Sequence, residues 1–244
     1  MDSGYYAACT ALVSRTQALD SIANNLANAS TVGFRAQHNV FSSVLAAAGS
    51  EPGSVNAAIN NYGVLGGTTL DQSQGALQKT GNDLDLAIEG SGFFVAQTAN
   101  GPMYTRDGAF QVSSKGQLVT SSGDPVMGDK GPLTMLPGPV SISADGTISS
   151  NGAVAGKLKL VQFAAGTSIT SAGQGYYTAP AKSEQPATDS SVRQGMLESS
   201  NVNPVSSMVE LITAQRSAEM MQRALSMFNS EMDKTATQEL PRIS

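Results

Sequence analysis

One stretch near the start of the chain decides the fold: Ala23-Asn24-Asn25-Leu26-Ala27-Asn28-Ala29-Ser30-Thr31-Val32-Gly33-Phe34-Arg35. The residues that lead into it recur in steps of four and three, the spacing of a helix that packs against another helix. Asparagine favours helix ends, and the glycine that follows can adopt the positive φ that stops a helix. We therefore predict a first helix over residues 3–29 that is stopped at Gly33. Its predicted seam is Tyr5, Cys9, Leu12, Thr16, Leu19, Ala23 and Leu26.

The asparagines of this stretch have two interpretations. Asn24 and Asn28 lie one helical turn apart, so their amides share a face and can bond to each other or to a partner. The plain alternative is a capped amphipathic helix whose asparagines only mark its end. The periodicity by itself favours this alternative.

The composition is that of a chain with few charges. Charged residues make up 14% and aromatic residues 5% of its 244 residues, tryptophan is absent, and the net charge is −5. Because globular proteins carry about 25% charged residues, we expect partners to cover part of this surface, or some segments to stay unfolded alone. The sequence has no basic stripe, so nucleic acid is not an expected partner. The single cysteine, Cys9, excludes an intrachain disulfide.

Hydropathy predicts neither a membrane span nor a cleaved leader. No run of 18 apolar residues occurs in the sequence, so no membrane insertion is predicted. The first residues lack a basic region followed by an apolar core, which predicts that there is no cleavable signal peptide. Export by a route that leaves the N-terminus intact is compatible with both observations.

The middle of the chain changes to strand periodicity. Short apolar runs alternate with turn dipeptides such as Asn100-Gly101 and Asp107-Gly108, which is typical of an all-β module. In the first predicted strand, Leu84, Leu86 and Ile88 face a core, and Asp83, Asp85 and Ala87 alternate with them.

A second long helix is predicted after Asn203-Pro204, because asparagine is a good N-cap and proline suits the first helical position. It can extend to about residue 239. Its predicted apolar face is Met208, Leu211, Ile212, Met221, Leu225, Phe228 and Met232, with Gln215 and Ala218 between them.

These patterns predict an α+β fold, in which long N- and C-terminal helices pair as a coiled coil and a central all-β domain is inserted between them. A two-helix unit buries little surface, so the helices are expected to need neighbours from other chains. The predicted segments are an N-terminal helical segment over 1–48, with helix resuming over 37–48, an extended linker over 49–81, the β domain over 82–180, a return linker over 181–203, and the C-terminal helix over 204–244.

The sequence offers little catalytic chemistry. A lone histidine, His38, makes a triad or zinc site improbable, and no cysteine–histidine cluster has metal-ligand spacing. A solvated face explains Asp83 and Asp85 better than a catalytic carboxylate pair. Gly90-Ser91-Gly92 is a poor match to a phosphate loop. We therefore predict no enzyme activity, no metal and no cofactor. Methionines at 208, 220, 221 and 227 indicate either an adaptable binding surface or coiled-coil packing.

Three blocks of the sequence resemble the signatures of bacterial flagellar rod, hook and basal-body proteins, in the order that the family has them. They lie at residues 24–35, 84–110 and 194–216, so the resemblance covers most of the chain. Proximal-rod proteins are the most similar members, and distal-rod proteins come next. The matching family-motif positions are Asn24, Asn25, Leu26, Asn28, Thr31, Gly33, Phe34, Gly92, Phe93, Phe94, Asn201, Val202 and Asn203.

The resemblance implies an axial structural protein of the flagellum that transmits torque to the hook and filament. It implies a place in the periplasmic rod, export unfolded by the flagellar type III apparatus, terminal helices that form an inner tube, and partners that are copies of the chain or other rod proteins. The alternative from another class is a carbohydrate-binding or enzymatic β module on a helical stalk, which needs exposed aromatic residues or carboxylates on the β domain. The expected subunit-interface residues are Leu12, Leu19, Ala23, Asn24, Leu26, Asn28, Met208, Leu211, Ile212, Met221, Leu225, Phe228 and Met232.

Overall fold

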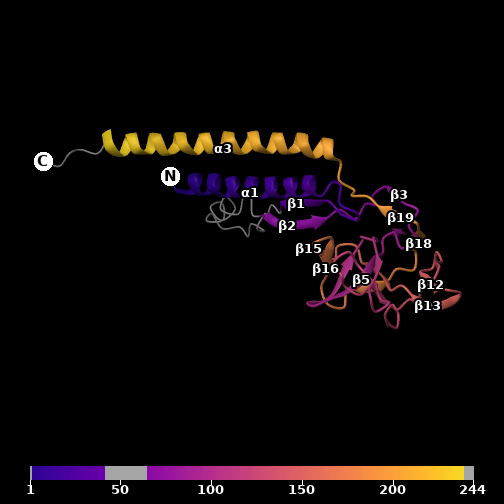
Figure 1. The fold of residues 1–244 in the computed structure, drawn as a ribbon. Coiled ribbons are helices and arrows are strands. Elements are labelled where there is room, and N and C mark those ends of the chain that lie inside the picture. Colours follow the sequence, from indigo (N-terminus) through magenta and orange to yellow (C-terminus); the bar gives the residue numbers. More distant parts are fainter. Residues whose placement is uncertain (1, 42–64, 239–244) are drawn as a thin grey trace. The chain divides into compact units, whose positions relative to one another are not determined.

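The computed structural model describes residues 2–41 and 65–238 (Figure 1). Two long helices flank a central region of β-strands in the sequence, as predicted. The chain divides into two compact units. The described residues of the first unit belong to 2–26, 38–41, 65–68 and 204–238, and the second unit comprises 27–37 and 69–203.

The helices are α1 (Asp2–Ala27) and α3 (Pro204–Gln238). α3 begins at the predicted proline. α1 ends six residues before Gly33, whose φ of 67° therefore does not cap the helix, contrary to the sequence prediction. Neither described helix is long and apolar enough to cross a membrane.

The most buried line on each helix has heptad spacing. On α1 it lies beside the predicted seam, whereas on α3 it includes the predicted residues Leu211, Met221 and Leu225. On α3, the predicted residues Met208 and Ile212 are 53% and 50% exposed. On α1, Thr16 and Ala23 are exposed, whereas Cys9, Leu12, Leu19 and Leu26 are half-buried. The predicted seams rest on hydropathy, so they leave out the small residues that occupy buried positions. The buried and half-buried lines are Ala11, Ser14, Ala18, Ser21 and Asn25 on α1, and Ser207, Leu211, Ala214, Ala218, Met221 and Leu225 on α3.

A strand replaces the start of the helix predicted over residues 37–48. β1 (Gln37–Phe41) pairs with β2 (Leu65–Leu70) in a two-stranded sheet. The partner strand is remote in sequence, so local periodicity could not indicate it. The rest of the predicted helix, residues 42–48, lies outside the described part of the chain.

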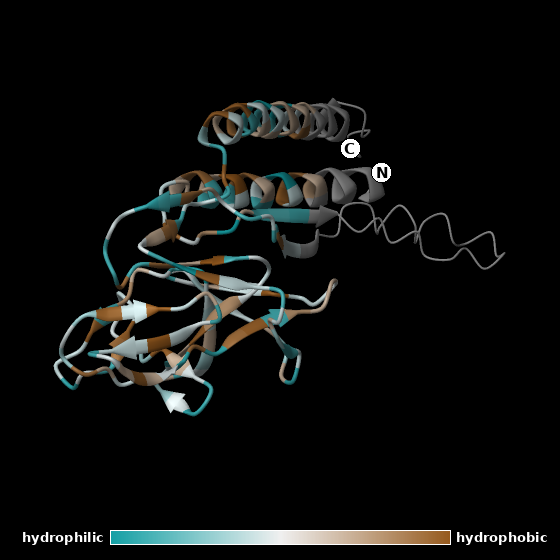
Figure 2. Ribbon diagram, turned by 90° about the vertical axis from the view of Figure 1, so that its right-hand side faces the viewer, coloured by the Kyte–Doolittle hydropathy of each residue, from teal (hydrophilic) through white to brown (hydrophobic). Residues whose placement is uncertain are grey.

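The second unit is built around a six-stranded antiparallel sheet in the order β15-β16-β6-β5-β14-β17. β5 is central, and Figure 2 shows apolar residues along the strands of this unit. The strands of the sheet are β5 (Phe93–Thr98), β6 (Gly101–Thr105), β14 (Leu160–Phe163), β15 (Thr170–Gly173), β16 (Tyr176–Thr178) and β17 (Glu184–Pro186).

Shorter ladders complete the second unit. β11 (Val140–Ile142), β12 (Thr147–Ser150) and β13 (Ala153–Lys157) form a three-stranded sheet. The paired strands are β4 (Leu86–Glu89) with β18 (Ser191–Gln194), β3 (Leu77–Lys79) with β19 (Met196–Glu198), β7 (Gln111–Val112) with β8 (Leu118–Val119), and β9 (Met127–Gly128) with β10 (Gly131–Pro132).

β5 separates two hydrophobic clusters, because successive side chains of a strand point to opposite faces. Phe94 joins one cluster and lies edge-on to Phe110, with ring centroids 5.0 Å apart. Phe93 and Val95 join the other, which also contains Tyr177. Both faces of β5 are therefore buried, and the two adjacent phenylalanines serve different cores.

The first predicted strand is more buried than its alternation indicates. Residues 85–88 are all buried, so Asp85 does not lie on a solvated face. Asp85 accepts a hydrogen bond from Asn82 Nδ2 at 2.8 Å, and its backbone carbonyl accepts one from the Gly195 N–H at 2.8 Å. β18 covers this region, because Ile88 of β4 pairs with Val192.

The segment interpreted from sequence as a return linker, residues 181–203, contains β17, β18 and β19. Each of these three strands pairs with a strand that lies at least 20 residues earlier in the sequence. The turn-rich composition of residues 181–203 is therefore that of short, paired edge strands and not that of an unstructured connection. The preceding predicted linker, 49–81, contains β2 and β3 in its described part.

Glu184 should make stability depend on acidity. Lys159 Nζ donates to Glu184 Oε2 at 2.7 Å and Tyr104 Oη to Oε1 at 2.6 Å, and these bonds lower the pKa of Glu184. A carboxyl pKa that is lower in the folded state stabilises the fold above the unfolded-state pKa, and this gain is lost as pH falls through the folded-state pKa.

We therefore expect the unfolding free energy of the natural chain to exceed that of Glu184→Gln near neutral pH by about 1 kcal/mol or less, because the pair is partly exposed. Denaturant titrations at decreasing pH should show this difference shrinking below the ordinary glutamate pKa of 4.5. A difference that stays constant through this range would contradict the assignment.

Candidate functional site

Three charged side chains, each from one of the three blocks that resemble the family, meet in a buried group in the second unit. With the neighbouring Tyr177 we call this group the ionic junction: Arg35, Arg106, Glu198 and Tyr177. Arg35 Nη2 lies 2.8 Å from Glu198 Oε1, and Arg106 Nη1 lies 3.0 Å from Glu198 Oε2. All three charged side chains are 1% exposed. One carboxylate is thus shared by two guanidinium groups with almost no contact with water.

Glu198 is held in place by the last strand of the unit. It ends β19, where it pairs with Leu77 of β3. The backbone N–H of Gly75 donates to Glu198 Oε1 at 2.9 Å. The carboxylate therefore has two arginines and one backbone amide around it, and these contacts fix its position.

Arg106 follows β6 and is anchored by the β core itself. Its Nη1 donates to the Ile88 carbonyl at 3.3 Å, its Nη2 donates to the Gly90 carbonyl, and its guanidinium lies 5.1 Å from the ring centroid of Phe93. Burial, followed by repulsion from Arg35, lowers the pKa of Arg106 to about 10. Arg106 therefore remains charged at neutral pH despite being buried.

Arg35 is bound less completely. Among the described residues, Glu198 supplies the carboxylate that pairs with it. In this part of the chain Nε, Nη1 and Nη2 of Arg35 have no hydrogen-bond partner, so Nη2 contacts Glu198 as an ion pair alone. Tyr177 supports the backbone instead: its hydroxyl accepts from the Arg35 N–H at 2.9 Å and lies 3.4 Å from the Gly33 carbonyl oxygen. Burial raises the pKa of Tyr177 to about 12, so the hydroxyl keeps its proton.

Residues 33–36, which we call the docking segment, are fixed by backbone contacts as well. The Gly33 N–H donates to the Glu198 carbonyl at 2.7 Å, and the Ala36 N–H donates to Asn201 Oδ1 at 2.7 Å. Asn201 Nδ2 in turn donates to the carbonyls of Asp71 and Ser73 at 3.2 and 3.1 Å. The amide of Asn201 therefore ties three separate stretches of chain together.

A small apolar cluster accompanies these bonds. Phe34, Ala36 and Val202 are buried together, and Ala29 packs against them. The chain enters the second unit through residues 27–37 and leaves it near residue 203. The docking segment therefore joins the beginning and the end of this unit.

The structure brings together only some of the predicted motif residues. Gly33, Phe34, Asn201 and Val202 meet in the docking contacts, and Phe93 lies beside Arg106. Phe94 belongs to the other core cluster. The Gly92 N–H donates to Ser190 Oγ at 3.0 Å. Thr31 Oγ1 donates to Asn28 Oδ1 at 3.2 Å. Asn25 is buried, Leu26 is half-buried, and Asn24 and Asn203 are exposed.

Sequence reasoning missed the charged centre. Arg35, Arg106 and Glu198 stand inside the blocks that resemble the family, yet none was chosen as a site residue. The sequence signal that could have indicated this centre is that each of the three blocks with the family signature contains a charged residue. Nothing local pairs them, because Arg106 and Glu198 are 92 residues apart in the chain.

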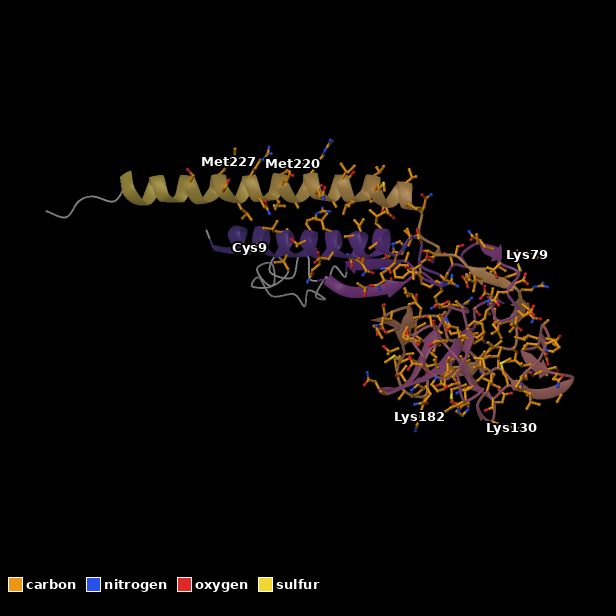
Figure 3. The ribbon with its side chains drawn as sticks, viewed as in Figure 1. Cys9, Lys79, Lys130, Lys182, Met220 and Met227 are labelled. Atoms are coloured by element: carbon orange, nitrogen blue, oxygen red, sulfur yellow. The ribbon has the colours of Figure 1, made fainter. Side chains whose placement is uncertain are left out.

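The expected interface residues differ in exposure. Leu225 is buried, and Leu12, Leu19, Leu211 and Met221 are half-buried, whereas Ala23, Met208 and Ile212 are exposed. The side chains of Phe228 and Met232 lie outside the described set. Met220 and Met227 on α3 (Figure 3) are 64% and 69% exposed, so core packing does not account for these two methionines. Within the described ranges, no group of three His, Cys, Asp or Glu side chains could hold a metal ion.

Gly33→Ala should damage the docking segment. An added Cβ would lie 2.3 Å from the Arg106 carbonyl carbon, and φ is positive. We expect a loss of about 2–4 kcal/mol in unfolding free energy, measured by denaturant titration of the full chain. The matched control is Gly81→Ala, where φ is 79° and no atom lies within 4 Å of the added Cβ, so only about 1 kcal/mol should be lost. Equal losses would exclude the close approach as the reason for glycine at position 33.

Comparison with known proteins assigns the family. Family models match at residues 6–35 (flagella basal body rod protein), 87–156 (flagellar hook protein FlgE/F/G D1 domain) and 193–239 (flagellar basal body rod FlgEFG protein C-terminal). The rod protein FlgF of Caulobacter vibrioides is 35% identical over all of both chains, and FlgF of Salmonella typhimurium is 37% identical over 92% of this chain and 93% of its own. FlgG of Buchnera aphidicola is 32% identical over 88% of this chain and 92% of its own. The chain therefore belongs to the family of flagellar basal-body rod and hook proteins.

Proposed function

We propose that this chain is a structural subunit of the bacterial flagellar basal-body rod, in its proximal part, with no enzymatic role. The observation that supports this most directly is the similarity to FlgF relatives along the whole chain. A rod subunit must carry torque between its terminal segments and its β unit. The ionic junction suits this task, because it joins the incoming and outgoing chain of that unit at one buried point.

A distal-rod subunit is the second candidate within the family. The FlgG relatives favour it, since they also align with most of the chain at slightly lower identity. Locating the protein within purified basal bodies by electron microscopy would separate the two positions.

A carbohydrate-binding or enzymatic β module is not favoured. Such a module needs aromatic side chains at its surface to stack on sugar rings. The aromatic residues available for this are all buried: Phe93, Phe94, Tyr104, Phe110, Phe163, Tyr176 and Tyr177.

For assembly, we propose that α1 and α3 pair in the manner of a coiled coil and that their remaining faces meet other subunits. The small residues on both buried lines support close approach of two helices. The exposed apolar residues Val209, Ile212, Met220 and Met227 on α3 support contacts beyond the pair. The partners would be copies of this chain or other rod proteins, and the amides of Asn24 and Asn28 would help to fix register across a subunit boundary.

The route to the rod is part of the same proposal. The chain would pass the flagellar export apparatus and would act in the periplasm. Support comes from its membership of the family of flagellar rod and hook proteins. Membrane insertion and nucleic-acid binding have no place in this function.

Leu225→Asp tests assembly. Leu225 is buried on α3, and an unpaired buried carboxylate costs several kcal/mol. In a strain that lacks the chromosomal gene, we expect this variant to abolish swimming in soft agar and to leave the variant out of purified basal bodies.

The matched control for this test is Leu225→Met, which conserves volume and apolarity and should swim normally. Amide exchange of the purified Leu225→Asp protein should show an intact β unit, so that failure is traced to the helices. Normal swimming by Leu225→Asp would remove this position from the helix pair and the interface.

A further inference from the structure

The ionic junction contains two positive charges and one negative charge. Arg35 and Arg106 are equally buried and contact the two oxygens of the same carboxylate. Burial, and after it repulsion from Arg35, lowers the pKa of Arg106. Without Glu198, docking of Arg35 would place a second buried cation beside the first, which is strongly unfavourable.

The two arginines do not depend equally on Glu198. Arg106 also donates to the carbonyls of Ile88 and Gly90 and lies over Phe93. Arg35 pairs with the Glu198 carboxylate, and its three side-chain nitrogens have no hydrogen-bond partner among the described residues. Arg106 can therefore be accommodated in the β core alone, whereas Arg35 needs the carboxylate.

The contacts that position Glu198 join residues far apart in the sequence. Its position requires β19 to pair with β3 and the Gly75 N–H to reach Oε1. The other contacts of the docking segment are equally remote, since Arg35 and Tyr177 are 142 residues apart, and Ala36 and Asn201 are 165 apart. Contacts across long separations carry a larger loop-closure cost than the hairpins of the sheet, and therefore tend to form later.

We infer that Glu198 determines the order in which the second unit folds. The docking segment binds the β unit only after the Glu198 carboxylate lies between the two guanidinium groups. The beginning and the end of the unit are then joined in the last step of its folding. This inference concerns folding of the second unit and stands apart from the rod assembly proposed above.

Variants of the full chain that change the charge of Glu198 or Arg35 test this role of Glu198 in folding. Glu198→Gln keeps the shape and leaves two uncompensated cations. We expect native-state hydrogen exchange at the Gly33 and Ala36 amides to accelerate by about 100-fold or more, whereas the Leu118 and Val126 amides in the β core change by less than about tenfold. Arg35→Met alone leaves the neutral Arg106–Glu198 pair and should have a smaller effect on Ala36.

The double variant separates charge from simple contact. Adding Arg35→Met to Glu198→Gln removes the repelled cation, so protection at Ala36 should recover by about tenfold relative to Glu198→Gln alone. If Glu198 merely held hydrogen bonds, the double variant would be at least as unprotected as the single one, and the inference would be overturned. The matched control is Glu89→Gln, which removes the same charge from an exposed pair with Arg193 and should leave Ala36 unchanged.

The folding order can be tested without any substitution. Pulse-labelling hydrogen exchange during refolding of the natural chain should show protection at Leu118 and Val126, which bond within the β core, before protection at Gly33 and Ala36. Protection of all four amides in the same kinetic phase, or of Gly33 first, would overturn the inference.

Discussion

A single carboxylate, that of Glu198, is shared by two buried guanidinium groups, and the second unit depends on this arrangement. In a chain with only 14% charged residues, three charges have been placed where water cannot reach them. Removing one partner from such a group leaves an uncompensated buried charge, which costs more than the intact group contributes. The arrangement therefore determines where the chain enters and leaves the unit more than it determines total stability.

The rest of the docking site follows from this constraint. The docking segment has to approach the Arg106 backbone closely, so position 33 has no side chain. Its amides need acceptors from the far end of the unit, which the Glu198 carbonyl, the Tyr177 hydroxyl and the Asn201 side chain supply. The family motifs at the two ends of the chain are therefore halves of one structure, and neither half forms its contacts without the other.

The helices follow a different principle. The buried line on α1 consists of alanine, serine and asparagine, and on α3 small residues alternate with Leu211, Met221 and Leu225. In the helix pair proposed above, close approach would therefore contribute more than hydrophobic bulk. Larger apolar residues such as Met220 and Met227 remain at the surface. This division suits a subunit whose helices are completed by neighbours, and whose β unit has its own cores and its own junction.

The sequence by itself determined the features that depend on neighbouring residues. Pro204 set the start of α3, Asn100-Gly101 marked the hairpin between β5 and β6, and the motif blocks identified the family. Asp107-Gly108, by contrast, lies between β6 and β7, which do not pair. Tertiary structure decided the features that depend on residues far apart: β1 in place of a helix, burial of Asp85, the identity of the buried heptad lines, and the ionic junction. The physical reason is the sequence separation over which each effect acts. Propensity and periodicity act over a few residues, whereas Arg35, Arg106 and Glu198 are brought together only when strands remote in sequence pair and exclude water from the charges between them.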